Sequence, residues 1–324
     1  MAVLSLVRAS FATRVGKALC AAAGVAAAAA GGCAWWLGSL LSPPRVIAAT
    51  TPAGLLLDYE EVSFRSKDGV PLAGWFVGGV PGAPTLVMAH DLGQDRSHLL
   101  SIGVPLQKAG YNLFLLDLRG HGRSGGHCSL GVLEKRDVLA ALDYLATRPD
   151  LDRRRFGFLG VRMGAQAGAL AALDRPELRA LVLDSPFPDV RTFLGEAVAS
   201  DERLRRALLP VPLLMYELRF RTSPDRESTA GAVRLLGDRD LLFITSRSDP
   251  GAPAVRKMYE SVPEGRNTDK NLLELPGSSI GPLYAADKKA YDDKLRTFFA
   301  DYLPITRPHA ATAEQKPRVP APRA

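Results

Sequence analysis

The sequence of 324 residues has few of the side chains that disulfides and metal sites need. It contains three cysteines and five histidines, and these do not occur in pairs at metal-binding spacing. Three cysteines also exclude a scaffold stapled by several disulfides. No glycine-rich phosphate loop follows a predicted strand. We therefore expect neither a metal nor a cofactor.

Acidic residues are missing from the start of the chain. Residues 1–49 contain four basic and no acidic side chains, and the residues after 303 contain four basic and one acidic. These two segments account for the whole net charge of +7, so the stretch between them is neutral. A nucleic-acid-binding core would carry the excess itself, and zinc-finger spacing and aromatic RNA-binding signatures are lacking. We expect no nucleic acid partner.

An uncharged run from Ala18 to Leu41 is long enough to cross about 30 Å of hydrocarbon as a helix. Three basic residues precede it, which predicts a cytoplasmic segment 1–17 and a folded part outside the cytoplasmic membrane. A single-pass anchor and a linker at 42–56 are the favoured interpretation. A cleaved signal peptide, or lipoprotein cleavage before Cys33, would instead give a secreted protein or a lipoprotein.

Between 57 and 303, short β-rich runs alternate with helical stretches, which predicts an α/β fold. We expect a mainly parallel eight-stranded sheet with helices on both faces. The strands are expected at 61–65, 72–77, 85–89, 113–116, 156–159, 181–183, 241–245 and 272–275, and the helices at 98–109, 132–146, 163–173, 254–260 and 284–302. The pattern breaks at about 187–236, which indicates a small helical lid over the edge where such sheets bind ligands. Residues 304–324, rich in Pro and Ala, are expected to be disordered.

Three motifs follow successive strands of this pattern: His90-Asp91-Leu92-Gly93, the segment Asp117–Ser124 (DLRGHGRS), and Gly160-Val161-Arg162-Met163-Gly164. With them the sequence from about 53 to 303 resembles the α/β-hydrolases, in the branch of bacterial serine aminopeptidase-like and acyl-hydrolase-like proteins. The resemblance implies an oxyanion hole built around His90, Asp91, Leu92 and Met163. It also implies that Gly160 and Gly164 flank a nucleophile elbow with the G-x-S-x-G pattern.

The catalytic positions depart from that family pattern. Arg162 stands where the nucleophilic serine belongs, and a guanidinium has no lone pair to offer for acyl transfer. In the loop after the last strand, Ile280 or Ser279 occupies the place of the histidine base. Asp249 matches the acid, although an aspartate before a helix also serves as an N-cap. Asp91 adds a carboxylate where negative charge should develop during hydrolysis.

We therefore expect a catalytically impaired protein that acts by ligand binding or scaffolding. Arg162, at positive φ, is expected to pair with Asp249 or Asp91, or to recognise a small anionic ligand. The alternative is an active serine-type hydrolase, of the esterase or peptidase class, with an atypical site. Ser185 and Ser124 are the nearest hydroxyls for it, whereas Cys128 fits a small buried residue. The sequence predicts no particular protein partner.

Overall fold

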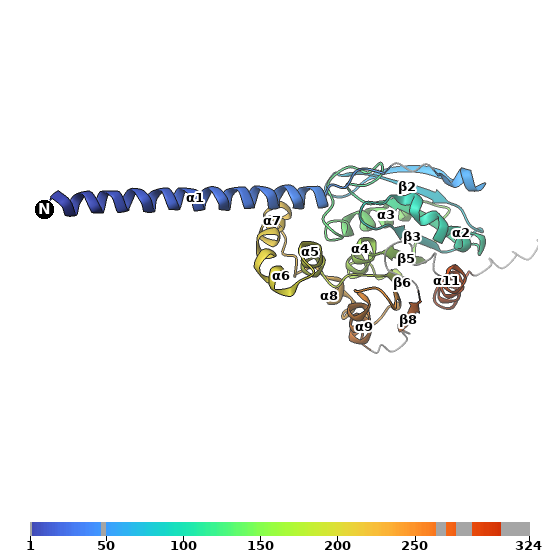
Figure 1. Cartoon of the computed structure of the whole chain (residues 1–324). Coiled ribbons are helices and arrows are strands. Elements are labelled where there is room, and N and C mark those ends of the chain that lie inside the picture. The colour runs from blue at the N-terminus through green and yellow to red at the C-terminus, as the bar shows by residue number, and fades with distance from the viewer. Residues whose placement is uncertain (1, 47–49, 264–269, 277–286, 306–324) are drawn as a thin grey trace, which may run out of the picture.

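This computed structural model describes residues 2–46, 50–263, 270–276 and 287–305. Its centre is an eight-stranded sheet in the order β1-β2-β4-β3-β5-β6-β7-β8 (Figure 1). The strands are β1 (Glu60–Arg65), β2 (Pro71–Val77), β3 (Thr85–Ala89), β4 (Asn112–Asp117), β5 (Phe156–Val161), β6 (Leu178–Asp184), β7 (Asp240–Ser246) and β8 (Lys270–Leu275). Strand β2 is antiparallel to β1 and β4, and the other neighbours are parallel. The predicted fold class is confirmed.

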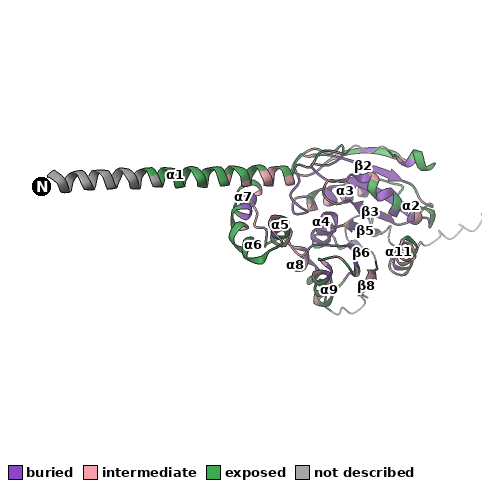
Figure 2. Ribbon diagram, in the orientation of Figure 1, coloured by how far each residue is buried: buried purple, intermediate pink, exposed green. Residues whose placement is uncertain are grey.

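Helices cover both faces of the sheet because its strands alternate between two apolar clusters. Val87 belongs to one cluster and its neighbours Leu86 and Met88 to the other. Figure 2 shows buried residues concentrated in the sheet and on the inner sides of these helices. The first face carries α3 (Lys135–Thr147), α4 (Met163–Ala172) and α9 (Ala252–Ser261), and the second carries α2 (Leu100–Lys108) and α11 (Lys288–Tyr302).

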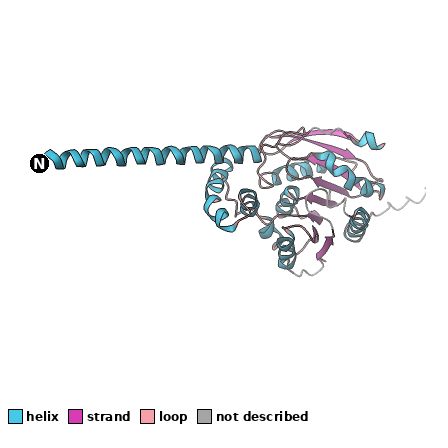
Figure 3. Cartoon of the chain, in the orientation of Figure 1, coloured by secondary structure: helices cyan, strands magenta, loops and turns pink. Residues whose placement is uncertain are grey.

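Four helices lie between β6 and β7, in the part of the chain expected to form a lid (Figure 3). They are α5 (Val190–Val198), α6 (Glu202–Leu208), α7 (Pro210–Phe220) and α8 (Thr229–Val233). Helix α8 packs on α4, while α5 packs on both α6 and α7. Asp189, Asp201 and Ser228 begin three of these helices by accepting a backbone N–H with the side chain.

The N-terminal helix α1 (Ala2–Leu40) extends away from the rest of the chain (Figure 1). Within the described residues, one stretch is long and apolar enough to cross a membrane, namely the 22 residues Leu19–Leu40. Its end is not free, because Leu37 and Leu41 are buried in the same apolar cluster as Tyr216 of α7. Helix α1 packs against α7 at this junction.

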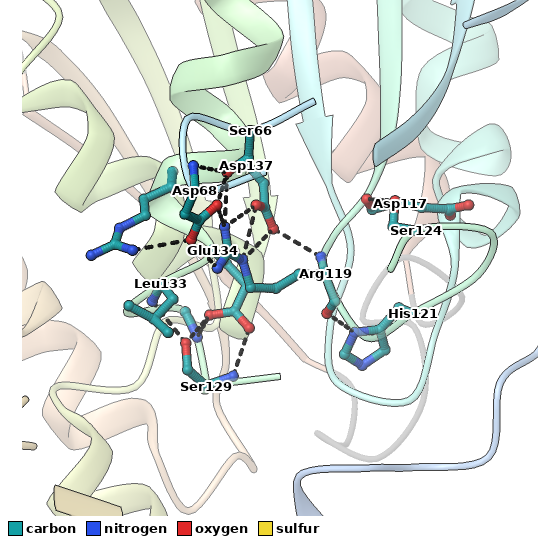
Figure 4. A network of polar contacts seen from close by, with 12 residues as sticks. Ser66, Asp68, Asp117, Arg119, His121, Ser124, Ser129, Leu133, Glu134 and Asp137 are labelled. Atoms are coloured by element: carbon teal, nitrogen blue, oxygen red, sulfur yellow. Dashed lines mark hydrogen bonds and ion pairs between the residues drawn. The ribbon is translucent and has the colours of Figure 1, made fainter. Parts of the chain in front are cut away.

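The turn after β4 is held by buried polar contacts (Figure 4). The Asp117 carboxylate accepts the backbone N–H groups of Arg96 and Arg123. A Cβ on Gly122, which has φ +47°, would lie 2.3 Å from that carboxylate, so the turn requires glycine there. Arg119 is buried and pairs with Asp137 through Nη2 at 2.7 Å. This motif therefore stabilises the fold.

Candidate functional site

The strand-to-helix turn from β5 to α4 keeps the backbone of a nucleophile elbow. Arg162 lies between the two elements with φ 47° and ψ −101°, a conformation that costs about 1–3 kcal/mol. A Cβ on Gly160 would lie 2.5 Å from the backbone of Ala165, and one on Gly164 would lie 2.3 Å from the carbonyl oxygen of Ala89. Both glycines are therefore needed for the close packing of helix on strand, and the expected positive φ of Arg162 is confirmed.

The side chain of Arg162 pairs with Asp91. Its Nε lies 3.1 Å from Oδ2 of Asp91, and the two side chains are 34% and 17% exposed. The other carboxylate oxygen, Oδ1, accepts the backbone N–H of Met163 at 3.3 Å. Burial raises the pKa of Asp91, while the Arg162 guanidinium and the N–H groups of Leu92 and Met163 oppose that rise. Asp91 thus occupies the Met163 N–H, one of the groups from which the family resemblance builds an oxyanion hole.

Asp249, the expected acid, has a local structural contact. Its Oδ1 accepts the backbone N–H of Gly251 at 2.8 Å, just before α9 begins. Of the two carboxylates expected to pair with Arg162, Asp91 is the one that does so. Ser279 and Ile280, at the expected histidine position, lie outside the described residues, as do residues 306–324 of the expected tail.

His90 and His121 hold the loops around the elbow and are not free to act as bases. Nε2 of His90 accepts the N–H of Leu118 at 3.1 Å, and Nδ1 lies 2.7 Å from the carbonyl oxygen of Asp91. Burial lowers the pKa of His90 to about 3, so the ring is neutral. Nε2 of His121 accepts the N–H of Gly93 at 3.0 Å. Both rings therefore position the loop that carries Asp91.

Ser124, a candidate nucleophile, and Cys128, expected to be a small buried residue, are both buried in structural contacts. Ser124 donates to the carbonyl oxygen of Asp117 at 2.6 Å and accepts the N–H of Ala73 at 2.9 Å. Cys128 is fully buried with its sulfur 3.4 Å from that of Met163, and burial raises the pKa of its thiol. Neither side chain is available to a substrate.

A cavity of about 630 Å³ opens beside the elbow, between the loop that carries Asp91, the ends of β5 and β6, and the lid. Its lining is partly apolar, with Leu99, Ile102, Val161, Phe187, Ala254 and Val255. Its charged lining is mostly acidic, because Asp91, Asp184, Glu196 and Asp249 face a single arginine, Arg162. The carboxylates outnumber the guanidinium, which opposes binding of an anion in this cavity.

Asp184 and Glu196 line this cavity but were not predicted from the sequence as site residues. Asp184 ends β6 directly beside Val161 of β5 and is 3% exposed. Its carboxylate accepts Tyr291 Oη at 2.7 Å and Ser185 Oγ at 2.9 Å. Burial raises the pKa of Asp184 to about 6 and also raises that of Glu196. The available signal was an aspartate at the end of a parallel strand, which becomes informative only once the strand order is known.

The sheet order, the elbow and the lid between β6 and β7 define a protein of the α/β-hydrolase class. The family model for the alpha/beta hydrolase fold matches residues 82–264, and the chain belongs to that family.

Among curated relatives, the chain is similar to the alpha/beta hydrolase domain-containing protein WAV2 of Arabidopsis thaliana, with 34% identity over 45% of this chain and 48% of the relative. It is also similar to an uncharacterized protein of Mycobacterium tuberculosis (strain H37Rv), with 30% identity over 70% of this chain and 77% of the relative. The chain spans about half the length of WAV2. Among solved structures, an esterase of Pyrococcus furiosus has a TM-score of 0.66 and 23% identity, covering 81% of this chain and 100% of that one. This likeness shows the fold alone.

Proposed function

We propose that this chain is a membrane-anchored member of the family that binds a small amphiphilic ligand and does not hydrolyse it. The observation that carries the proposal is the Asp91 carboxylate on the backbone N–H of Met163, paired with Arg162 at the nucleophile position. Acyl transfer needs that donor for the developing oxyanion and needs a hydroxyl or thiol where Arg162 stands. A bound carboxylate repels a second negative charge at the same place.

The ligand class follows from the cavity lining. The apolar side chains suit a short hydrocarbon body, and the surplus of carboxylates suits a cationic head such as an amine. An anion recognised by Arg162 alone would have to displace Asp91 and approach Asp184 and Glu196. We therefore prefer an amine to the anionic ligand that the sequence suggested.

The anchor is assigned to Leu19–Leu40 of α1, with the N-terminus in the cytoplasm and the folded part on the other side. In support, this stretch is apolar and projects from the rest of the chain, and basic residues precede it. Intact-mass analysis of the membrane fraction tests this assignment. A mass that includes the whole of residues 2–41 supports the anchor, whereas a mass that lacks part of this segment, or a lipid-modified mass, contradicts it.

Catalysis is tested by labelling the full chain with a fluorophosphonate probe and by turnover of acyl and peptide esters. We expect neither. The alternative, an active hydrolase with an atypical site, has one specific observation in its favour: Ser185 lines the cavity and its hydroxyl lies 2.9 Å from the Asp184 carboxylate. Labelling that disappears in Ser185→Ala would establish that alternative and end the proposal.

Ligand binding is tested with a matched pair, octylamine and octanoate, at concentrations below aggregation. We expect octylamine to raise the melting temperature and octanoate to leave it unchanged. A ligand at ten times its dissociation constant stabilises by about 1.4 kcal/mol. Glu196→Gln should weaken amine binding about tenfold, as loss of one charge-assisted contact, whereas Glu202→Gln, on the exposed side of α6, should not. Stabilisation by octanoate and not by octylamine would contradict the amine and support the anionic ligand expected from the sequence.

A further inference from the structure

The lid carries an apolar surface that the rest of the described chain leaves uncovered. We call it the lid apolar face, and it consists of Leu204, Leu208, Val211, Leu214 and Leu218. These residues are separated by four, three, three and four positions, the spacing of one helical stripe. Leu209, between α6 and α7, also has helical dihedral angles, so the stripe continues from one helix to the next. Its side chains are 41% to 72% exposed, and Figure 2 shows these two helices largely exposed.

The position of the lid apolar face is set by the anchor helix. Helix α7 packs against α1, and Leu37 of α1 shares a buried cluster with Leu213 and Tyr216 of α7. Figure 1 shows α6 and α7 on the side of the folded part from which α1 projects. Trp35, five residues before Leu40, is 75% exposed, and tryptophan favours the interface between membrane and water. With Trp35 at this interface, α7 would lie at the same level.

The charges around the stripe suit phospholipid headgroups. Arg203 and Arg219 are exposed on α6 and α7, and by helical spacing they flank the lid apolar face. A helix with apolar side chains on one face and arginines beside them is typical of segments that lie in the membrane interface. Within α6 and α7 the basic residues outnumber the acidic ones, which gives these two helices a small positive net charge. The basic side chains are Arg203, Arg205, Arg206 and Arg219, and the acidic ones are Glu202, which contacts Arg206 at 2.9 Å, and Glu217.

We propose that the lid apolar face lies in the surface of the same bilayer that α1 enters, with its arginines on anionic headgroups. This inference rests on the membrane anchoring proposed above and extends it to the lid. Helix α5, which brings Glu196 to the cavity, packs on both α6 and α7. The membrane-bound helices are thereby connected to the cavity wall, where an amphiphilic ligand from the bilayer would arrive.

The experiment uses the full chain in vesicles of phosphatidylcholine and phosphatidylglycerol, with Cys20 and Cys33 replaced by alanine. Leu214→Cys and Leu218→Cys are labelled with an environment-sensitive fluorophore. The matched control is Leu56→Cys, 96% exposed after η1 (Pro52–Leu55), the light blue helix at the opposite end of Figure 1. We expect blue-shifted emission at 214 and 218, quenching by spin-labelled lipid, and protection from aqueous iodide, with the opposite behaviour at 56.

Two results would overturn the inference. Emission and iodide quenching at 214 and 218 equal to those at 56 would mean that the face is in water. Protection from iodide without quenching by spin-labelled lipid would mean that a second copy of the chain covers it. Extraction with alkaline carbonate distinguishes failure of the lid contact from failure of the anchor. If the chain stays in the vesicles while residue 214 is in water, the anchor is retained and only the lid contact is wrong.

Discussion

The Nε atom of Arg162 lies 3.1 Å from one oxygen of Asp91, and the other oxygen of that carboxylate accepts the N–H of Met163. Two departures from the family pattern therefore compensate each other. The carboxylate occupies the Met163 N–H of the elbow, and the guanidinium neutralises the carboxylate. Either change alone would leave a charge without its partner in a mostly buried position.

This compensation predicts coupling between the two residues. Arg162→Gln should destabilise the protein because the Asp91 carboxyl group loses its countercharge. In an Asp91→Asn background the same change should cost less, because no carboxyl group is left to neutralise. The loss of unfolding free energy in the double variant should be about 1 kcal/mol smaller than the sum of the losses in the two single variants. Denaturant unfolding of the four proteins in detergent measures the coupling, and additive effects would show that the pair contributes nothing.

Ser124 should matter for stability and not for reactivity. Its hydroxyl joins the carbonyl oxygen of Asp117 to the N–H of Ala73 in a fully buried place. Ser124→Ala leaves two buried polar groups without that partner and should cost about 2 kcal/mol. The exposed Ser200→Ala is the control, with an expected change within about 0.5 kcal/mol. An unfolding free energy unchanged in Ser124→Ala would mean that water replaces the hydroxyl.

The sheet and the elbow could be predicted because their signals are local. Strand β3 has the expected bounds, Thr85–Ala89, since an apolar run of that length between turn residues specifies a buried strand. The elbow glycines could be predicted because a strand, a tight turn and a helix follow one another within a few residues. The positive φ of Arg162 followed from the same local pattern.

The charge of the cavity could not be predicted in this way. Asp184 and Glu196 meet Arg162 only because β6 lies beside β5 and because the lid returns across the carboxyl ends of the strands. Strand order and lid placement depend on long-range packing, which periodicity does not report. For the same reason the sequence indicated an apolar anchor but not that its end, at Leu37 and Leu41, is buried against α7.

Gly164 should be intolerant of even one methyl group. An added Cβ would lie 2.3 Å from the carbonyl oxygen of Ala89, a backbone atom that cannot turn aside. Gly164→Ala should therefore destabilise the protein by about 1–3 kcal/mol through overpacking. Gly78→Ala, where an added Cβ meets nothing within 4 Å, is the matched control. Equal melting temperatures for the two variants would contradict the close helix-on-strand packing.

Asp184 should make stability depend on pH. Burial raises its pKa to about 6 in the folded protein, so the folded state holds this proton more tightly than the unfolded chain. Protonation of Asp184 therefore stabilises the fold as the pH falls from above 6 towards 4, and its ionised form costs stability above 6.

Asp184→Asn removes the charge and keeps a carbonyl acceptor. The stability of the variant relative to the wild type should rise between pH 4 and pH 8 by an amount on the order of 3 kcal/mol. Taking this difference cancels groups common to both proteins, such as Asp137, whose pKa burial raises to about 7. Unfolding free energies measured at both pH values give the answer, and a difference that does not change with pH would mean that the Asp184 carboxylate is stabilised in the fold as well as it is in water.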